Sequence, residues 1–399
     1  MAEEGRDIAG RVALVHDFLL DLRGAERVFA ALCDMFPQAD LFTAVYDVVG
    51  TEGRFATRQV NTSSLQRLRP TARTFRALMP FYPGAVESID LRGYDLVVSS
   101  SSAWAHGVIP DEQAVHVCYC HNPFRYAWNA REETLARWPA PLRPVLSRTL
   151  SRWRAWDTLA ARRVDRYVAN SETTRRRLHR YYGREAEVLA PPVETTRFTP
   201  LPASRIGENY VVLSELMAHK RLDVAVRACS QLRLPLLVIG KGPDARRLAR
   251  MAGPTVRFAG RLSDAEVALE LARSRALIVT AAEEFGIAAV EAQAAGRPVL
   301  ALRAGGARDT VIDGQTGAFF ENPEPADLVA ALRQFDAGAY RPEDCVASSQ
   351  RYDVAVFTQA MLRTVRAALA GQPDTTADRA RARRRPPRRS RGLASPQDK

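Results

Sequence analysis

Two carboxylates separated by a turn occur where a buried strand is followed by a helix. Glu283 and Glu291 are eight positions apart, and the apolar run 276–279 comes just before them. In an open parallel sheet, ligands bind at the carboxyl ends of the strands, where this pattern places the first carboxylate. Carboxylates at that edge can accept hydrogen bonds from sugar or ribose hydroxyls without a metal ion. The alternative is that both are solvated charges on an amphipathic helix.

Glycines and a lysine occur at the ends of other predicted strands in the same half of the chain. Gly240, Lys241 and Gly242 lie between an apolar strand and a helix, so their N–H groups could face an anion. Lys220 follows another strand and could supply a point charge to a phosphate. The alternative for Lys220 is an exposed lysine at a helix start. With the two carboxylates, these residues predict a pocket for phosphates and hydroxyls, the two features of a nucleotide sugar.

The first half of the chain offers two further candidates. Gly24 and Ala25 form a turn and helix start soon after the first apolar strand, and His121 and Arg125 lie four positions apart at the end of a later strand. We interpret His121 as a residue at the edge of a cleft. The alternative is a packed or capping histidine, which is the more common role of a single histidine.

Strand-like and helix-like segments alternate twice along the chain. The predicted strands of the first half are residues 12–15, 95–100, 114–119 and 166–171. Those of the second half are residues 210–214, 236–239, 256–258, 276–279 and 299–302. Because such alternation produces parallel sheets wrapped by helices, we predict an α/β protein with two doubly wound, Rossmann-like domains that face a cleft.

A proline-rich segment between positions 191 and 202 marks the expected domain boundary. We assign residues 1–200 to the N-terminal domain and residues 201–371 to the C-terminal domain, which carries the predicted nucleotide-sugar pocket. The last predicted helix, 354–369, is placed to return to the first domain. Residues 372–399 carry eight arginines and one lysine against three aspartates. This composition predicts a disordered basic tail.

Composition and the N-terminal sequence favour a cytoplasmic protein. Hydrophobic residues make up 46% of the 399 residues, no apolar run is long enough to span a bilayer, and the first residues lack the pattern of a secretory signal. The five cysteines are scattered, which indicates reduced, structural thiols. Cys118 and Cys120 should share one face of a strand, with Tyr119 on the other.

The net charge of +12 raises the question of an anionic partner, and about half of it lies in the tail. The tail could bind anionic lipid or nucleic acid without sequence specificity, or act only as a solubilising segment. The arginine-rich stretch 143–163, with Trp153 and Trp156, favours an anionic membrane surface. The alternative is a solvated helix face. Nothing in the folded part indicates specific recognition of nucleic acid.

Metal chemistry is not expected. The chain has no Asp-x-Asp pair of the kind that holds a divalent ion in metal-dependent sugar transfer, no phosphate-binding loop motif and no zinc-ligand spacing. We therefore expect neither a metal nor a cofactor, and we expect any phosphate to be neutralised by Lys, Arg and helix N-termini.

These motifs resemble the family-4 retaining glycosyltransferases of the GT-B fold, over about residues 11–369. The most specific marker is Glu-x7-Glu, formed by Glu283 and Glu291. Three segments look closest to the bacterial GDP-mannose-dependent mannosyltransferases of polysaccharide assembly: residues 116–126, residues 169–171 with 191–193, and residues 291–298.

The resemblance implies that residues 1–200 form the acceptor-side domain and residues 201–371 the nucleotide-sugar-binding domain, and it implies a role for each matching position. Glu283 would hold the donor sugar, Glu291 the ribose and Lys220 the diphosphate, with His121 near the sugar. By this resemblance His121, Lys220 and Glu283 are the catalytic candidates. The donor-binding candidates are Gly24, Ala25, Arg125, Gly240, Lys241, Gly242, Arg261, Leu262, Phe285, Gly286, Ile287 and Glu291.

The chain departs from the family pattern near the diphosphate. Glu215 stands where the family has an arginine, and a buried negative charge there would repel a diphosphate. Lys241 restores a positive charge nearby, whereas Ala25 replaces a glycine and His106 a basic residue. The sequence thus predicts a retaining, metal-independent transferase acting on a lipid-linked or glycan acceptor. The alternative is a catalytically weak or inactive nucleotide-sugar-binding protein that acts as a regulator or partner subunit.

Overall fold

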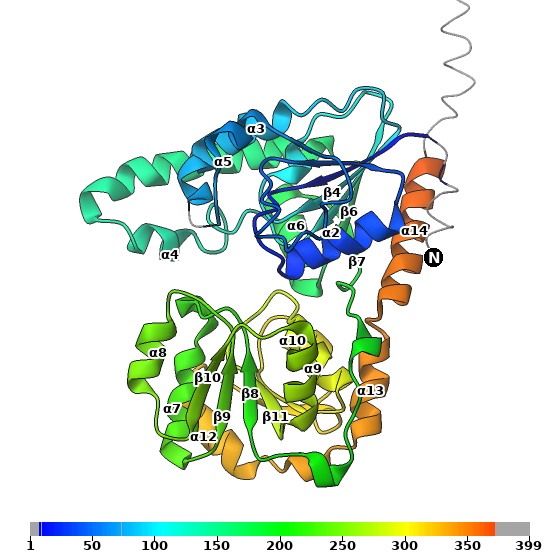
Figure 1. The fold of residues 1–399 in the computed structure, drawn as a ribbon. Coiled ribbons are helices and arrows are strands. Elements are labelled where there is room, and N and C mark those ends of the chain that lie inside the picture. Colours follow the sequence, from blue (N-terminus) through cyan, green and yellow to red (C-terminus); the bar gives the residue numbers. More distant parts are fainter. Residues whose placement is uncertain (1–7, 9, 73, 372–399) are drawn as a thin grey trace, which may run out of the picture.

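The computed structural model describes residue 8, residues 10–72 and residues 74–371, which form two α/β domains stacked on either side of a cleft (Figure 1). The predicted fold class is confirmed: each domain is a parallel sheet covered by helices. The predicted basic tail, 372–399, lies outside the described residues.

The first domain contains a seven-stranded parallel sheet in the order β3-β2-β1-β4-β5-β6-β7. Its strands are β1 (Val12–His16), β2 (Asp40–Thr43), β3 (Val60–Thr62), β4 (Leu96–Ser101), β5 (Val115–Cys120), β6 (Arg166–Ala169) and β7 (Ala186–Val188). Its helices are α2 (Gly24–Met35), α3 (Tyr82–Glu87), α4 (Arg131–Ala136), α5 (Arg143–Ala160) and α6 (Glu172–Tyr182).

The second domain contains a six-stranded parallel sheet in the order β10-β9-β8-β11-β12-β13. Its strands are β8 (Tyr210–Leu213), β9 (Leu236–Ile239), β10 (Val256–Gly260), β11 (Ala276–Val279), β12 (Val299–Leu302) and β13 (Gly317–Phe320). Its helices are α7 (Leu222–Leu232), α8 (Ala245–Met251), α9 (Asp264–Arg273), α10 (Ile287–Ala294), α11 (Ala307–Thr310), α12 (Pro325–Gln334) and α13 (Pro342–Gln350).

The central strands are buried on both faces, as apolar runs of this kind require. In β5, Cys118 and Cys120 pack into one hydrophobic cluster and Tyr119 into another on the opposite face, as their alternation predicts. A capping box starts α9: Ser263 accepts from the N–H of Glu266, whose carboxylate accepts from the N–H of Ser263.

The last helix, α14 (Val354–Ala370), leaves the second domain and packs against the first (Figure 1). Asp353 caps its first turn by accepting from the N–H of Ala355. Phe357, Met361 and Val365 project from one face of α14 into the core formed by α2 and the first sheet. The chain passes between the domains twice, first through the linker and then through α14. This second connection is therefore a buried, apolar contact.

Two tryptophans do not lie where the sequence interpretation put them. Trp153 and Trp156 were expected at a membrane-facing surface, but both project from α5 into an aromatic cluster around the buried Trp104. The two side chains are three positions apart, so they lie on one face of α5, and both are partly buried against this cluster. Among the described helices, none has the length and apolarity that crossing a membrane requires.

Candidate functional site

A cavity of about 470 Å³ lies in the cleft between the domains, where the carboxyl ends of strands from both sheets meet. The second domain contributes the ends of β8 and β11 and the start of α10, and the first contributes the start of α2 and the end of β5. Parallel sheets bind ligands at this edge because loops and helix N-termini converge there.

Lys220 and Glu283 meet on one wall of this cavity as a partly buried ion pair between Nζ and Oε2. Lys220 ends a short 3₁₀ turn after β8, and its backbone carbonyl accepts from Thr280 Oγ1 at 2.9 Å. Glu283 lies in the loop between β11 and α10. The pair thus joins two neighbouring strand ends, and it offers a cation to phosphate and a carboxylate to hydroxyls.

Two helix N-termini face each other across the cavity. Gly286 has φ of 89°, which allows the turn into α10, and Phe285 and Ile287 line the wall beside it. Opposite them, Gly24 begins α2, and a Cβ built on it would come 3.4 Å from Ile287 Cδ1. Backbone N–H groups at both helix starts give the cavity a positive potential suited to an anion.

Glu291 does not line the cavity in this structure. It lies in the second turn of α10, is only 8% exposed, and accepts from Arg197 Nη2 at 2.8 Å. Burial raises the pKa of Glu291, and the nearby Arg197 and Arg27 guanidiniums oppose that rise. Its predicted contact with a ribose stays a prediction.

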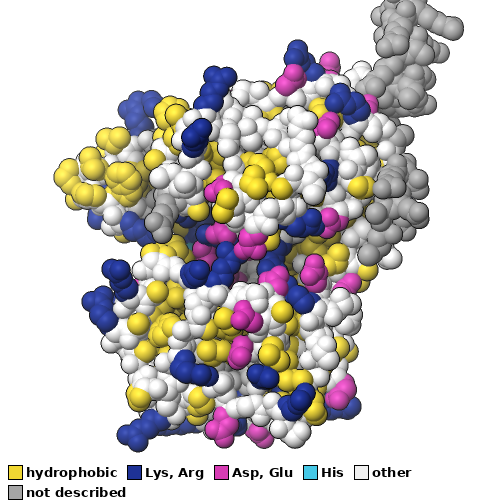
Figure 2. Space-filling view, in the orientation of Figure 1, with side chains coloured by type: hydrophobic (Ala, Val, Ile, Leu, Met, Phe, Trp, Pro, Cys, Tyr) yellow, Lys and Arg dark blue, Asp and Glu magenta, His cyan; other side chains and the backbone are white. Residues whose placement is uncertain are grey.

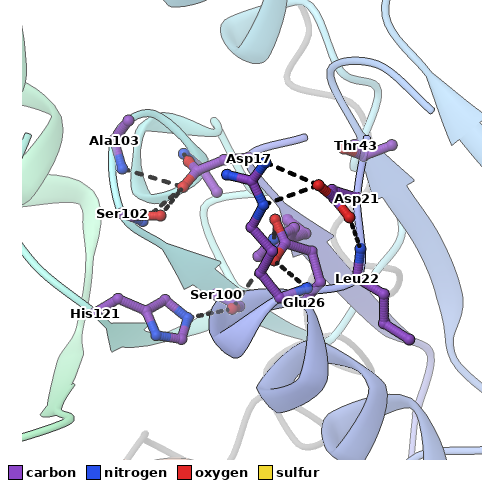
Figure 3. Close-up of polar contacts among 12 residues, drawn as sticks. Asp17, Asp21, Leu22, Glu26, Thr43, Ser100, Ser102, Ala103 and His121 are labelled. Atoms are coloured by element: carbon purple, nitrogen blue, oxygen red, sulfur yellow. Dashed lines mark hydrogen bonds and ion pairs between the residues drawn. The ribbon is translucent and has the colours of Figure 1, made fainter. Parts of the chain in front are cut away.

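His121 lies at the end of β5 and lines the cavity. Ser100 Oγ is 2.9 Å from His121 Nε2 and 3.1 Å from His16 Nδ1, so one hydroxyl can donate to one ring and accept from the other (Figure 3). Burial, reinforced by the neighbouring His16, lowers the pKa of His121 to about 3. The imidazole is therefore neutral at physiological pH and acts as a polar contact rather than a cation. Arg125 lines the same wall.

Asp17, which the sequence interpretation missed, holds the loop that contributes Ser102 to the cavity (Figure 3). Its fully buried carboxylate accepts from the backbone N–H groups of Ser102, Ala103, Trp104 and Ala105 at 2.6, 3.1, 2.7 and 2.6 Å. The serines at the end of β4 were the signal that the sequence offered for this loop. Their contact with Asp17, which follows β1, is a tertiary contact that the sequence does not reveal.

Glu215, whose negative charge departs from the family pattern, is paired across the cleft. Arg23 Nη1, at the start of α2, lies 2.8 Å from Glu215 Oε1, and both residues line the cavity. Arg23 also donates to Asp21 at 2.8 Å. In the family pattern, an arginine of the second domain occupies the position of Glu215. Here an arginine of the first domain, Arg23, lies opposite that acid.

Further ion pairs span the cleft at its rim, where charged side chains of both signs alternate (Figure 2). Arg27 is paired with Asp264 at 2.6 Å, and Arg177 with Glu284 at 3.2 Å. Arg261 is paired with Glu52. These contacts hold the two domains together while the cavity between them stays open.

Besides Glu291, five predicted donor-site residues are not brought into the cavity. Gly240 and Gly242 pack against the backbone after β8, where an added Cβ would come 1.9 Å from the carbonyl oxygen of Ser214 and 2.3 Å from that of Leu216. Lys241 is exposed, and Leu262 packs into a hydrophobic cluster. The fifth, Arg261, lies at the rim in its ion pair. The close packing of the loop after β9 against the loop after β8 is therefore enough to explain why positions 240 and 242 are glycines.

The buried neutral histidines make stability depend on pH. Burial lowers the pKa of both His116 and His121 to about 3, so between about pH 6.5 and pH 3 the unfolded chain binds more protons than the native one. We expect the free energy of unfolding to fall as pH drops below 6.5, by about 1.4 kcal/mol per pH unit for each histidine. Urea unfolding of His121→Asn at pH 7, 6 and 5 should show a shallower slope. A slope equal to that of the wild type would contradict the prediction.

Comparison with known protein families gives two matches that together account for most of the chain. The family model described as "Glycosyltransferase Family 4" matches residues 22–197, and that described as "Glycosyl transferases group 1" matches residues 206–350. The first match falls within the first domain and its linker, and the second covers the sheet and most helices of the second domain.

Curated relatives match over part of their length. A D-inositol 3-phosphate glycosyltransferase of Geodermatophilus obscurus is 32% identical over 53% of this chain and 56% of its own. A GDP-mannose-dependent alpha-(1-6)-phosphatidylinositol monomannoside mannosyltransferase of Mycolicibacterium smegmatis is 32% identical over 41% of this chain and 50% of its own. The chain thus spans about half the length of the curated relatives it matches.

Solved structures show the same fold at low identity. The sucrose-phosphate synthase of Thermosynechococcus elongatus matches with a TM-score of 0.70 at 16% identity, over 91% of this chain and 100% of that one. Anabaena Alr3699/HepE in complex with UDP-glucose matches with a TM-score of 0.68 at 18% identity, over 89% and 99%.

Proposed function

Because this chain belongs to the family-4, group 1 glycosyltransferases and has their GT-B fold, we propose that it moves a hexose from a nucleotide sugar to an acceptor, with retention of configuration and without a metal ion. The observation that carries the proposal is the Lys220–Glu283 pair on the wall of the cleft cavity. The pair combines a phosphate-binding cation and a hydroxyl-binding carboxylate in one place, between two helix N-termini.

Each group has a role in the proposed transfer. Glu283 would accept from the donor sugar's hydroxyls, and His121, neutral and fixed by Ser100, would hydrogen-bond the sugar from the opposite domain. The bond between the anomeric carbon and the diphosphate oxygen breaks, and a bond to the acceptor oxygen forms on the same face. The acceptor's proton passes to the departing phosphate, whose developing charge Lys220 and the N-termini of α2 and α10 stabilise.

We propose GDP-mannose as the donor and a lipid-linked or glycan molecule as the acceptor. The mannosyltransferase name of one relative at 32% identity supports mannose. We further propose that the protein works in the cytoplasm at an anionic membrane face.

Calorimetric titration with GDP, GDP-mannose and UDP-glucose, each with and without EDTA, tests the donor. We expect GDP and GDP-mannose to bind, unchanged by EDTA, because the phosphates face Lys220 rather than a metal. Glu291→Ala should weaken binding by about 10- to 100-fold, since it removes a charged acceptor from the predicted ribose contact. A requirement for a divalent ion, or preference for UDP-glucose, would contradict the proposal.

A second candidate is a nucleotide-sugar-binding protein without transfer activity, which the acidic Glu215 in the cavity wall favours. It predicts donor binding in the same titration, but no hydrolysis or transfer when donor and acceptor lipids are incubated together. A loss of the donor in that incubation would exclude it.

A further inference from the structure

A ten-residue tip projects from the first domain between α4 and α5, far from both sheets (Figure 1). All of residues 136–145 are exposed, and eight of the ten are Ala, Pro, Trp, Leu or Val. The largest of these side chains remain well exposed: Trp138 47%, Leu142 47% and Val145 67%. Hydrophobic atoms accordingly gather at the end of this projection (Figure 2).

The backbone of the tip needs little water to satisfy its polar groups. Pro139, Pro141 and Pro144 have no N–H to donate. The side chain of Arg143 donates to the backbone carbonyls of Trp138 at 3.0 Å and Ala136 at 3.3 Å, which fixes the turn. A backbone with few free donors is what an apolar surrounding tolerates.

Basic side chains outnumber acidic ones around this apolar tip. Residues 136–156 contain five arginines and neither aspartate nor glutamate, and the acids just before them, Glu132 and Glu133, are ion-paired with Arg131 and Arg137. Arg148 and Arg152 lie one turn apart on the exposed face of α5, in line with Val145. A surface with an excess of positive charge disfavours pairing with a second copy of itself and favours a partner rich in negative charge.

We propose that the tip, residues 136–145, inserts into the headgroup region of an anionic lipid bilayer, with the arginines of α5 on the lipid phosphates. The amphipathic Trp138 and the apolar Leu142 would enter the interface, and each arginine adds affinity for anionic headgroups. This surface replaces the one assigned from the sequence to Trp153 and Trp156, both of which are partly buried against the core.

The projection is tied to the wall of the proposed donor site. Arg125 lines the cavity, and its carbonyl accepts from the N–H of Ala130, the residue before α4, at 2.8 Å. A docked tip would therefore hold the cavity beside the membrane surface, where a lipid-linked acceptor is found. This consequence rests on the proposed transferase function, whereas membrane binding itself does not.

Flotation of the full-length protein with vesicles tests the proposal, without any nucleotide present. We expect binding to phosphatidylcholine vesicles that contain phosphatidylglycerol and little binding to phosphatidylcholine alone. The double variant Trp138→Glu/Leu142→Glu should lose at least about tenfold in partitioning. The matched control Val49→Glu/Phe81→Glu changes two apolar side chains that are more exposed than these, elsewhere on the first domain, and it should float as the wild type does.

Three outcomes would overturn the proposal. One is flotation of the tip variant equal to that of the wild type. Another is flotation that is lost when the arginines of residues 379–391 are replaced by serine and is unaffected by the tip variant, which would assign binding to that segment. The last is a change of oligomeric state in the tip variant with unchanged flotation, which would make the tip an interface between copies. Because the altered side chains are exposed, an unchanged melting temperature is expected for both variants.

Discussion

Replacing Lys220 by alanine is expected to lower kcat/KM for sugar transfer by about 100- to 1,000-fold. Lys220 lies on the cavity wall, paired with Glu283, and in the proposed transfer its ammonium stabilises the departing diphosphate. Its removal takes away a charge-assisted contact that strengthens as the phosphate leaves, so kcat should fall along with kcat/KM. Initial rates with the donor identified by titration, at saturating acceptor, measure the change.

Lys241→Ala is the matched control for this prediction. Lys241 is exposed and does not line the cavity, so its loss should change kcat/KM by less than about threefold. A loss of less than tenfold in Lys220→Ala would contradict the assignment and point to Arg23 or the helix N-termini as the main source of stabilisation. Thermal melts of both variants distinguish a lost charge from a lost fold.

Replacing Asp17 by alanine is expected to destabilise the protein by at least about 3 kcal/mol. The carboxylate is fully buried and accepts from four successive backbone N–H groups, those of residues 102–105. Without it, these donors stay buried with no acceptor, and the loop that places Ser102 in the cavity loses its anchor. Urea unfolding monitored by tryptophan fluorescence gives the change in free energy.

An exposed aspartate provides the comparison for Asp17. Asp90 forms its hydrogen bonds with Arg92 at the surface, so Asp90→Ala should leave the urea midpoint almost unchanged. If Asp17→Ala unfolded at the same midpoint as the wild type, water or a neighbouring group would have to satisfy the four donors. The loop would then not depend on the carboxylate.

Much of the fold could be predicted because its signals are local. Apolar runs such as 276–279 became buried strands, and the alternation of strands and helices led to two parallel sheets. The Glu-x7-Glu spacing placed Glu283 at a strand end on the cavity wall. His121, Lys220 and Gly24 also line the cavity, because strand ends in parallel sheets converge on one edge.

The remaining features depend on tertiary contacts that no spacing encodes. Arg23 offsets the charge of Glu215 from the other domain, so the sequence alone showed an unexplained acid at that position. Gly240 and Gly242 have the pattern of an anion-binding turn, yet close packing of two loops accounts for them. Glu291 is in the expected helix, but Arg197 from the linker covers it.

The return of α14 to the first domain has a consequence for the order of folding during synthesis. Phe357, Met361 and Val365, with their neighbours on α14, complete a core whose other members come from the first half of the chain. On the ribosome, the first domain therefore emerges with an apolar groove that stays unfilled until the whole second domain has been made. The chain reaches its native state only once its last helix has been released, so the two domains mature together rather than one after the other.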